Sequence, residues 1–134
     1  MTYSREQVEE ATLKYFQGNQ LATTVWIDKY ALKNDGVFHE IDPDDMYRRE
    51  AKELARMELK YPNPMSESEI YHLLRGFAYI CPQGSPMSGI GNPFTFTSLS
   101  NCFVIGQHPD SYGGILRADE EQAQLMKMRG GVGQ

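Results

Sequence analysis

The sequence predicts an α+β protein that is mostly α-helical, and two observations support this fold class. Between residues 1 and 80, apolar residues recur at intervals of three and four behind residues that favour helix N-termini. At Cys81 the composition shifts to glycine, proline and serine, and a short β-prone run and one more helical pattern follow. We therefore expect an N-terminal helical region, residues 1–80, and a second region, residues 81–134, that contains a strand and a helix.

Composition narrows the classes of function. The net charge of −5 argues against a general nucleic-acid-binding surface, which is normally basic. No apolar run reaches the roughly 18 residues that suggest a transmembrane helix, and the polar start MTYSREQVEE lacks the apolar core of a signal peptide. Two cysteines, Cys81 and Cys102, do not make a disulfide framework. We therefore expect a cytoplasmic protein with both thiols reduced and with no membrane or nucleic-acid partner.

The first two predicted helices have clear start signals. Ser4 and Gln7 have the spacing of a capping box, which predicts a helix that ends at Gly18. Asn19 caps the second predicted helix, whose apolar positions continue to Leu32. Both patterns are amphipathic, which is typical of helices that pack on one face.

The third predicted helix follows a turn signal at residues 34–36 and an ambiguous run at residues 37–41. Asp42 is its predicted N-cap and Pro43 its first residue, and the helix continues to Leu59. We interpret its charged face as solvated and supported by helical ion pairs. That face consists of Arg48, Arg49, Glu50, Lys52, Glu53, Arg56 and Glu58.

A second capping box, Ser66 with Glu69, predicts a fourth helix that runs to Phe77. Nothing in residues 1–80 indicates a site. The three histidines lack metal-ligand spacing, so we expect structural roles for them and no metal site. They are His39, His72 and His108.

The second region is predicted to begin with a loop over residues 82–93. Residues 102–105 are β-prone and predict a buried strand, beside a loop that can hold a polar ligand. Asp110 and Ser111 are the candidate N-caps of a last helix. The glycine-rich end, residues 129–133, suits either a helix C-cap turn or a phosphate contact.

Four motifs in the second region carry a family resemblance: SPMSG, SLSNCFVI, DSYGGI, and a helix that ends in RGGVG. In this order and at similar spacings they resemble the start of the catalytic barrel of the ribonucleotide reductase large chain. The upstream run KYPNPMSESEI and residues 14–32 are similar to the same family. The match is closest to the adenosylcobalamin-dependent (class II) branch, although class I large chains have the same barrel. The resemblance spans nearly all of this chain but only a minor, N-terminal part of a reductase.

The resemblance implies a ten-stranded α/β barrel, of which residues 81–134 are the incomplete start with the first strand and helix. In this family a thiyl radical abstracts a ribose hydrogen, and two cysteines on neighbouring strands then supply the reducing electrons and become a disulfide. The cysteine of the SNC motif, here Cys102, is one of that pair. Without the resemblance, a cysteine on an apolar strand is by default an inert buried residue.

The resemblance also implies substrate-binding and effector-binding residues. Ser85 lies near where family members place a hydroxyl on the substrate diphosphate or ribose, and Asn101 faces the substrate region beside the cysteine. Gly131 matches a glycine whose backbone approaches the substrate. Asp110 matches an acid that holds the deoxyribose of the effector nucleotide at the dimer interface, where the helix over residues 111–129 would pack against its mate in a second subunit.

The partners implied are a ribonucleotide substrate, a deoxynucleotide or ATP effector, and a thioredoxin-type reductant that regenerates the dithiol. The radical source implied is adenosylcobalamin or, in the alternative, a metal-containing small subunit. The sequence does not distinguish diphosphate from triphosphate substrates. Cys81 matches no catalytic position, and we interpret it as structural.

Of the family's active-site cysteines, these 134 residues contain Cys102, and the others are expected in the remainder of the reductase chain. We therefore expect the 134 residues alone to be inactive and to bind no cofactor. A truncated sequence, a split gene and an intein at the glycine turn are the explanations left open, and an N-terminal ATP-cone does not fit before residue 1. The alternative interpretation is a non-catalytic helical module that binds a reductase subunit or an effector nucleotide.

Overall fold

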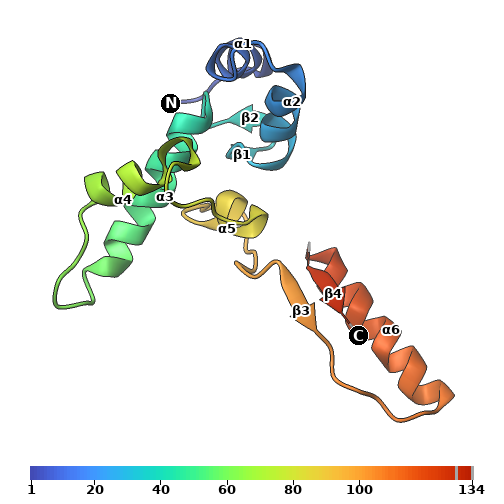
Figure 1. Ribbon diagram of the computed structural model, residues 1–134. Helices are drawn as coiled ribbons and strands as arrows, with labels where there is room; N and C mark the ends of the chain where they lie inside the picture. The colour runs from blue at the N-terminus through green and yellow to red at the C-terminus, as the bar shows by residue number, and fades with distance from the viewer. Residues whose placement is uncertain (129, 134) are drawn as a thin grey trace.

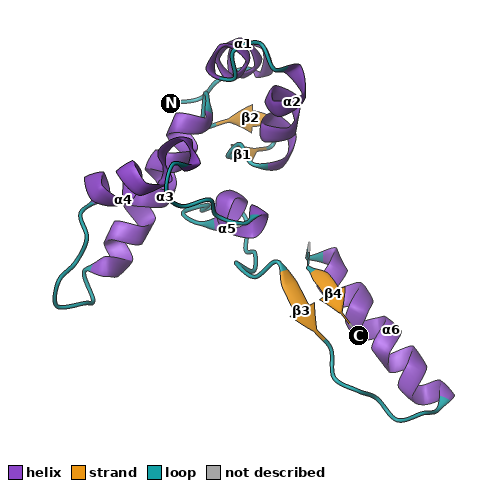
Figure 2. Ribbon diagram, viewed as in Figure 1, coloured by secondary structure: helices purple, strands orange, loops and turns teal. Residues whose placement is uncertain are grey.

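The structure, a computed structural model, describes residues 1–128 and 130–133, so Arg129 and Gln134 lie outside the described residues. Helices dominate and the strands are short, which confirms an α+β, mostly α class (Figure 2). Within the described residues the strands form two two-stranded sheets and no closed barrel. Figure 1 shows helices α1 to α4 toward one end of the chain and the unit of β3, α6 and β4 at the other, with α5 between them.

Helices α1 (Arg5–Tyr15) and α2 (Gln20–Lys29) pack against each other and begin as predicted. Ser4 and Gln7 form the capping box, and the Asn19 side chain accepts a hydrogen bond from the backbone N–H of Ala22 at 3.0 Å. Helix α2 ends three residues before the predicted Leu32, and Tyr30 is its C-cap.

The ambiguous run after the second helix, residues 37–41, begins with a two-residue strand. Strands β1 (Lys33–Asn34) and β2 (Val37–Phe38) pair antiparallel across the predicted turn, where Gly36 has a φ of +80°. Tyr3 bridges to Phe38 on the other side. This small hairpin brings the start of the chain onto the helical region.

Helices α3 (Pro43–Glu58) and α4 (Glu67–Leu74) form the most extensive helix pair. Their N-caps Asp42 and Ser66 are as predicted. A 3₁₀ turn, Arg75–Phe77, replaces the predicted last turn of α4, because Gly76 at its centre has a φ of +63°. The core lies between α1 to α4 and β2 and consists of Val8, Trp26, Ile27, Ala31, Phe38, Met46, Tyr47, Ala51, Ile70 and Leu74.

The interpretation of the charged face of α3 as solvated is wrong at two residues. Glu50 is completely buried, and neither of its carboxylate oxygens has a hydrogen-bond partner among the described residues. The Arg49 side chain is only 9% exposed and forms an ion pair with the 3% exposed side chain of Glu40, at 2.6 Å. Helix α3 is contacted by neighbours on more than its apolar face, and charge pattern alone does not reveal such contacts.

The segment predicted as a loop contains helix α5 (Gly84–Gly89). The guanidinium of Arg49 holds the C-terminal part of this segment by donating hydrogen bonds to the carbonyls of Met87, at 2.9 Å, and Ile90. Glycine and proline are poor helix formers, so tertiary contacts compensate for weak local preference.

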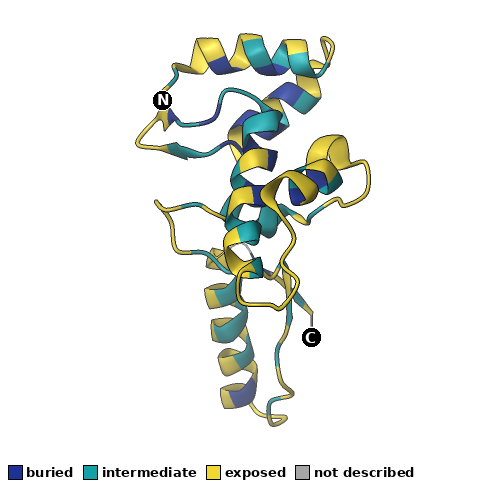
Figure 3. Ribbon diagram, turned by 90° about the vertical axis from the view of Figure 1, so that its left-hand side faces the viewer, coloured by how far each residue is buried: buried dark blue, intermediate teal, exposed yellow. Residues whose placement is uncertain are grey.

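Strand β3 (Cys102–Val104), helix α6 (Tyr112–Lys127) and strand β4 (Gly131–Gly133) form a parallel β–α–β unit. Two sequence predictions are wrong here. The strand at Cys102 is not buried in the described structure, since Val104 is 89% exposed, and Gly131 lies in a strand rather than in a turn. Figure 3 shows most buried residues in the N-terminal part of the chain, whereas α6 is largely intermediate or exposed.

Candidate functional site

Cys102 and Gly131 are neighbours across the parallel sheet of β3 and β4. The backbone N–H of Gly131 donates to the carbonyl of Asn101 at 2.7 Å. A Cβ added to Gly131 would lie 3.6 Å from the Cys102 Sγ. The glycine therefore leaves one side of the exposed thiol open, and a larger residue would cover it.

Asn101 joins this sheet to helix α5. Its side-chain Oδ1 accepts a hydrogen bond from the backbone N–H of Ser85 at 2.8 Å, and its Nδ2 donates to the Gln83 Oε1 at 2.7 Å. Ser85 is buried, with 9% exposure. Four residues proposed from the sequence, Ser85, Asn101, Cys102 and Gly131, thus form one contiguous cluster, which we call the thiol cluster.

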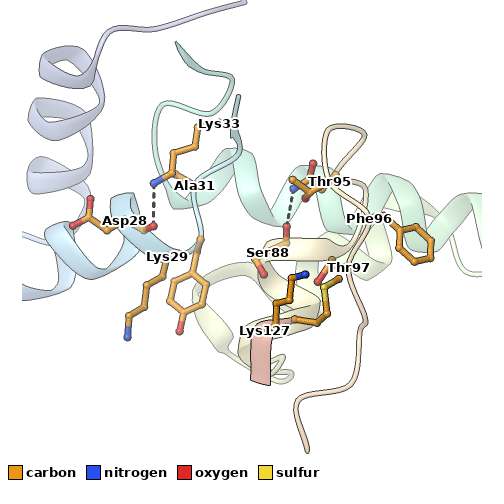
Figure 4. A pocket seen from close by; sticks show the side chains of 12 residues that line it. Asp28, Lys29, Ala31, Lys33, Ser88, Thr95, Phe96, Thr97 and Lys127 are labelled. Atoms are coloured by element: carbon orange, nitrogen blue, oxygen red, sulfur yellow. Dashed lines mark hydrogen bonds between the residues drawn. The ribbon is translucent and has the colours of Figure 1, made fainter. Parts of the chain in front are cut away.

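A cavity of about 370 Å³ opens beside the thiol cluster. Its residues come from the end of α2, from α5 and from the segment before β3, and they are Asp28, Lys29, Tyr30, Gly84, Ser85, Ser88 and Asn101. A second cavity, of about 230 Å³, shares the α2 residues and Ser88 with the first. Figure 4 shows Ser88, Thr97 and Lys127 gathered at one end of this second cavity, with Lys29 on α2 at the other.

The residues from α2 are the part of the site that sequence reasoning missed. No motif marks Lys29 or Tyr30, and both belong to the region in which we expected no site. The one signal proposed from the sequence, the resemblance of residues 14–32, points to a segment and not to particular side chains, and it stays a prediction. Their position beside α5 arises from long-range packing.

Asp110 lies apart from the thiol cluster. It is exposed, on the connection between β3 and α6, and Gly131 follows the opposite end of α6. The 16 residues of this helix span about 24 Å. The N-cap of α6 is Ser111, whose hydroxyl accepts from the N–H of Gly114 at 3.1 Å, so the capping role considered for Asp110 is wrong. Its effector-binding role stays a prediction.

The three histidines each contact a neighbouring side chain. His39 stacks on Phe94 with ring centroids 4.7 Å apart, and the Nε2 of His108 lies 3.1 Å from a carboxylate oxygen of Glu121. His72 lies against the ring of a tyrosine. Among residues 1–128 and 130–133, no three His, Cys, Asp or Glu side chains group as metal ligands would.

Cys81 is exposed and is not part of the thiol cluster, and its Sγ lies 3.8 Å from the carbonyl oxygen of the adjacent Pro82. Its structural role stays a prediction. None of the helices in the described part of the chain combines the length and the apolar character needed to cross a bilayer.

The fold and the site define an α+β protein with an exposed thiol on a parallel β–α–β unit, where the neighbouring Asn101 lines a cavity. Comparisons with protein-family models, with curated proteins and with solved structures found no match to this chain.

Proposed function

We propose that this chain is the N-terminal part of a ribonucleotide reductase large chain, with Cys102 as one of its two reducing thiols. The observation that carries the proposal is the thiol cluster. Three separate parts of the sequence meet in it: Ser85 is bonded to the Asn101 side chain, Asn101 precedes Cys102, and Gly131 pairs with Cys102. Such a cluster is what a site for a polar substrate next to a redox thiol requires.

The topology of the second region supports the proposed barrel. Parallel strands β3 and β4 joined through α6 are the repeating unit of α/β barrels. On this proposal they are the first strand, helix and second strand of the ten-stranded barrel. The remainder of the reductase chain would cover the exposed apolar residues of this unit, which include Val104, Tyr112, Ile115, Leu116 and Met126.

In the proposed reaction, two thiols reduce one ribonucleotide, and atoms and electrons balance. The ribonucleotide loses its 2′-hydroxyl as water and gains a C2′–H bond, while the two thiols lose two electrons and two protons and become a disulfide. Cys102 is one thiol, and the second belongs to the remainder of the chain. A thioredoxin-type dithiol restores the pair by thiol–disulfide exchange.

The remaining components of the proposal follow the resemblance. Adenosylcobalamin, or in the alternative a metal-containing small subunit, supplies the radical that starts the reaction. On this proposal the radical source is bound outside the described residues, and no step on this chain is assigned to it. A deoxynucleotide or ATP effector binds near Asp110 at a homodimer interface that includes α6, and the enzyme works in the cytoplasm.

The test exchanges each cysteine for serine in the reassembled reductase, that is, in this chain combined with the remainder of the reductase chain. Cys102→Ser abolishes dithiol-dependent reduction of ribonucleotides, whereas the matched control Cys81→Ser, at the chain's other exposed cysteine, keeps wild-type turnover. Full dithiol-dependent turnover in Cys102→Ser would overturn the assignment.

One observation favours a second candidate, the non-catalytic binding module. Helix α6 and strand β3 expose large apolar side chains, including Tyr112 at 88% and Leu116 at 68%, and such surfaces are typical of partner interfaces. A module of this kind would bind a reductase subunit or an effector nucleotide equally well with Cys102→Ser. Retained binding together with unchanged turnover in that variant would favour the module.

A further inference from the structure

The cavity beside the thiol cluster has one wall to which the proposed function assigns no role. Ser85 and Asn101 line one side, and the end of α2 lines the other with Asp28, Lys29 and Tyr30. Tyr30 reaches the candidate site closely, because its hydroxyl oxygen lies 3.7 Å from where a Cβ on the neighbouring Gly84 would be. The α2 side chains therefore share the cavity with the residues that we assign to the substrate.

The charge balance of this wall favours an anionic ligand. The Asp28 carboxylate is already paired with the guanidinium of Arg5, at 3.1 Å. None of the ion pairs between described residues involves Lys29. In a chain with a net charge of −5, this leaves a lysine on the lining of a cavity whose one lining carboxylate, Asp28, has its own partner.

The hydrogen-bond donors of the cavity match the same kind of ligand. The Ser88 hydroxyl is already used, since it donates to the Gly84 carbonyl at 3.0 Å. The other side-chain donors along the cavity are the Lys29 ammonium, the Tyr30 and Ser85 hydroxyls and the Asn101 amide, which already donates to Gln83. Phosphoryl oxygens accept several hydrogen bonds at once, and those from a charged donor are the strongest.

We propose that Lys29 and Tyr30 bind the phosphoryl groups of the nucleotide whose ribose lies beside Cys102. This inference rests on the proposed reductase function, because the ribose position comes from it. It assigns a substrate-binding role to the N-terminal helical region. The N-terminal helices would then help to select phosphorylated nucleotides over nucleosides.

The first experiment measures binding to the 134-residue chain by amide chemical-shift titration with cytidine diphosphate, inorganic pyrophosphate and cytidine. We expect the two phosphorylated probes to shift the amides of Lys29, Tyr30 and Ser85, and cytidine to leave them unchanged. Lys29→Met should weaken pyrophosphate binding about tenfold or more, the effect of one charge-assisted hydrogen bond. Lys29→Arg should restore most of the affinity, and Lys14→Met, at an exposed lysine of α1, should match wild type. Absence of pyrophosphate binding, or equal binding by Lys29→Met, would overturn the inference.

The second experiment separates this inference from the proposed function. In the reassembled reductase, Lys29→Met should raise the KM for the ribonucleotide about tenfold with kcat close to wild type, because the lost contact binds substrate and transition state alike. Reduction with an unchanged KM would sink the phosphoryl site and leave the reductase proposal standing. If the reassembled protein reduces no ribonucleotide but still binds pyrophosphate in a Lys29-dependent way, the reductase proposal falls and the phosphoryl site stands.

Discussion

The variant Glu50→Gln tests most directly whether the carboxyl group of Glu50 is buried as the structure shows. The residue is completely buried in α3, and its two carboxylate oxygens lack hydrogen-bond partners among the described residues. Burial raises the pKa of Glu50 from an ordinary 4.5 to about 8, and the attraction of Arg49 offsets only part of this effect. Glutamine keeps the shape and polarity of the side chain and removes only its ionisation.

The pKa difference fixes the sign and the size of the effect. Because the folded pKa is the higher one, the folded state binds more protons than the unfolded state, and stability falls as pH rises from about 4.5 to about 8. Each pKa unit corresponds to about 1.4 kcal/mol, so at pH 7 the wild-type chain has lost about 3 kcal/mol relative to pH 4 through Glu50 alone. We expect Glu50→Gln to be about 3 kcal/mol more stable than wild type at pH 7 and similar to it at pH 4.

Urea denaturation from pH 4 to pH 8, followed by the fluorescence of the single, buried Trp26, measures this difference. Subtracting the wild-type free energy of unfolding at each pH cancels the titration of all other groups. Glu10→Gln, at an exposed glutamate of α1, is the matched control and should follow wild type at every pH. A variant that is less stable than wild type at pH 7, or a difference that does not change with pH, would refute the reasoning.

Two further predictions test the anchoring of α5 and the position of the thiol. Arg49→Met should lower the free energy of unfolding by about 3–5 kcal/mol in urea denaturation, because it leaves Glu40 buried without its partner. Arg56→Met, which removes an exposed ion pair, should have little effect, and equal losses in both variants would contradict this prediction. Gly131→Val should slow the reaction of Cys102 with a maleimide severalfold, because the new side chain would lie against the Sγ. The chain's other cysteine should react at an unchanged rate, and unchanged rates at both would show that the glycine does not lie beside the thiol.

Local signals predicted the helix starts well, because a cap is a contact within one turn of chain. The N-caps Ser4, Asn19, Asp42 and Ser66 each accept the hydrogen bond that the sequence pattern predicts. The residues of the thiol cluster were named from the sequence only through the family resemblance, and their roles stay predictions. Spacing alone gives no reason to bring Ser85 next to residues near the end of the chain.

Long-range packing explains what the sequence did not predict. Helix α5 contains two glycines and a proline in six residues, so local preference argues against it, and Arg49 and Asn101 stabilise it from distant parts of the chain. The burial of Glu50 depends in the same way on the neighbours of α3. Val104 is an apolar residue that the sequence predicts to be buried and that is exposed, because an apolar strand is buried only where another element covers it.

Asn101 connects helix α5, which is held to the helical region, with strand β3, which carries Cys102. Helix α5 is held to the helical region by the buried side chain of Arg49, while β3 belongs to a unit that has little buried apolar surface of its own. The Asn101 side chain bonds to the α5 segment, and its backbone carbonyl accepts from Gly131. The position of Cys102 relative to the cavity therefore depends on a chain of polar contacts that starts at Arg49. The placement of the thiol thus depends on the helical region as much as on the strand that carries it.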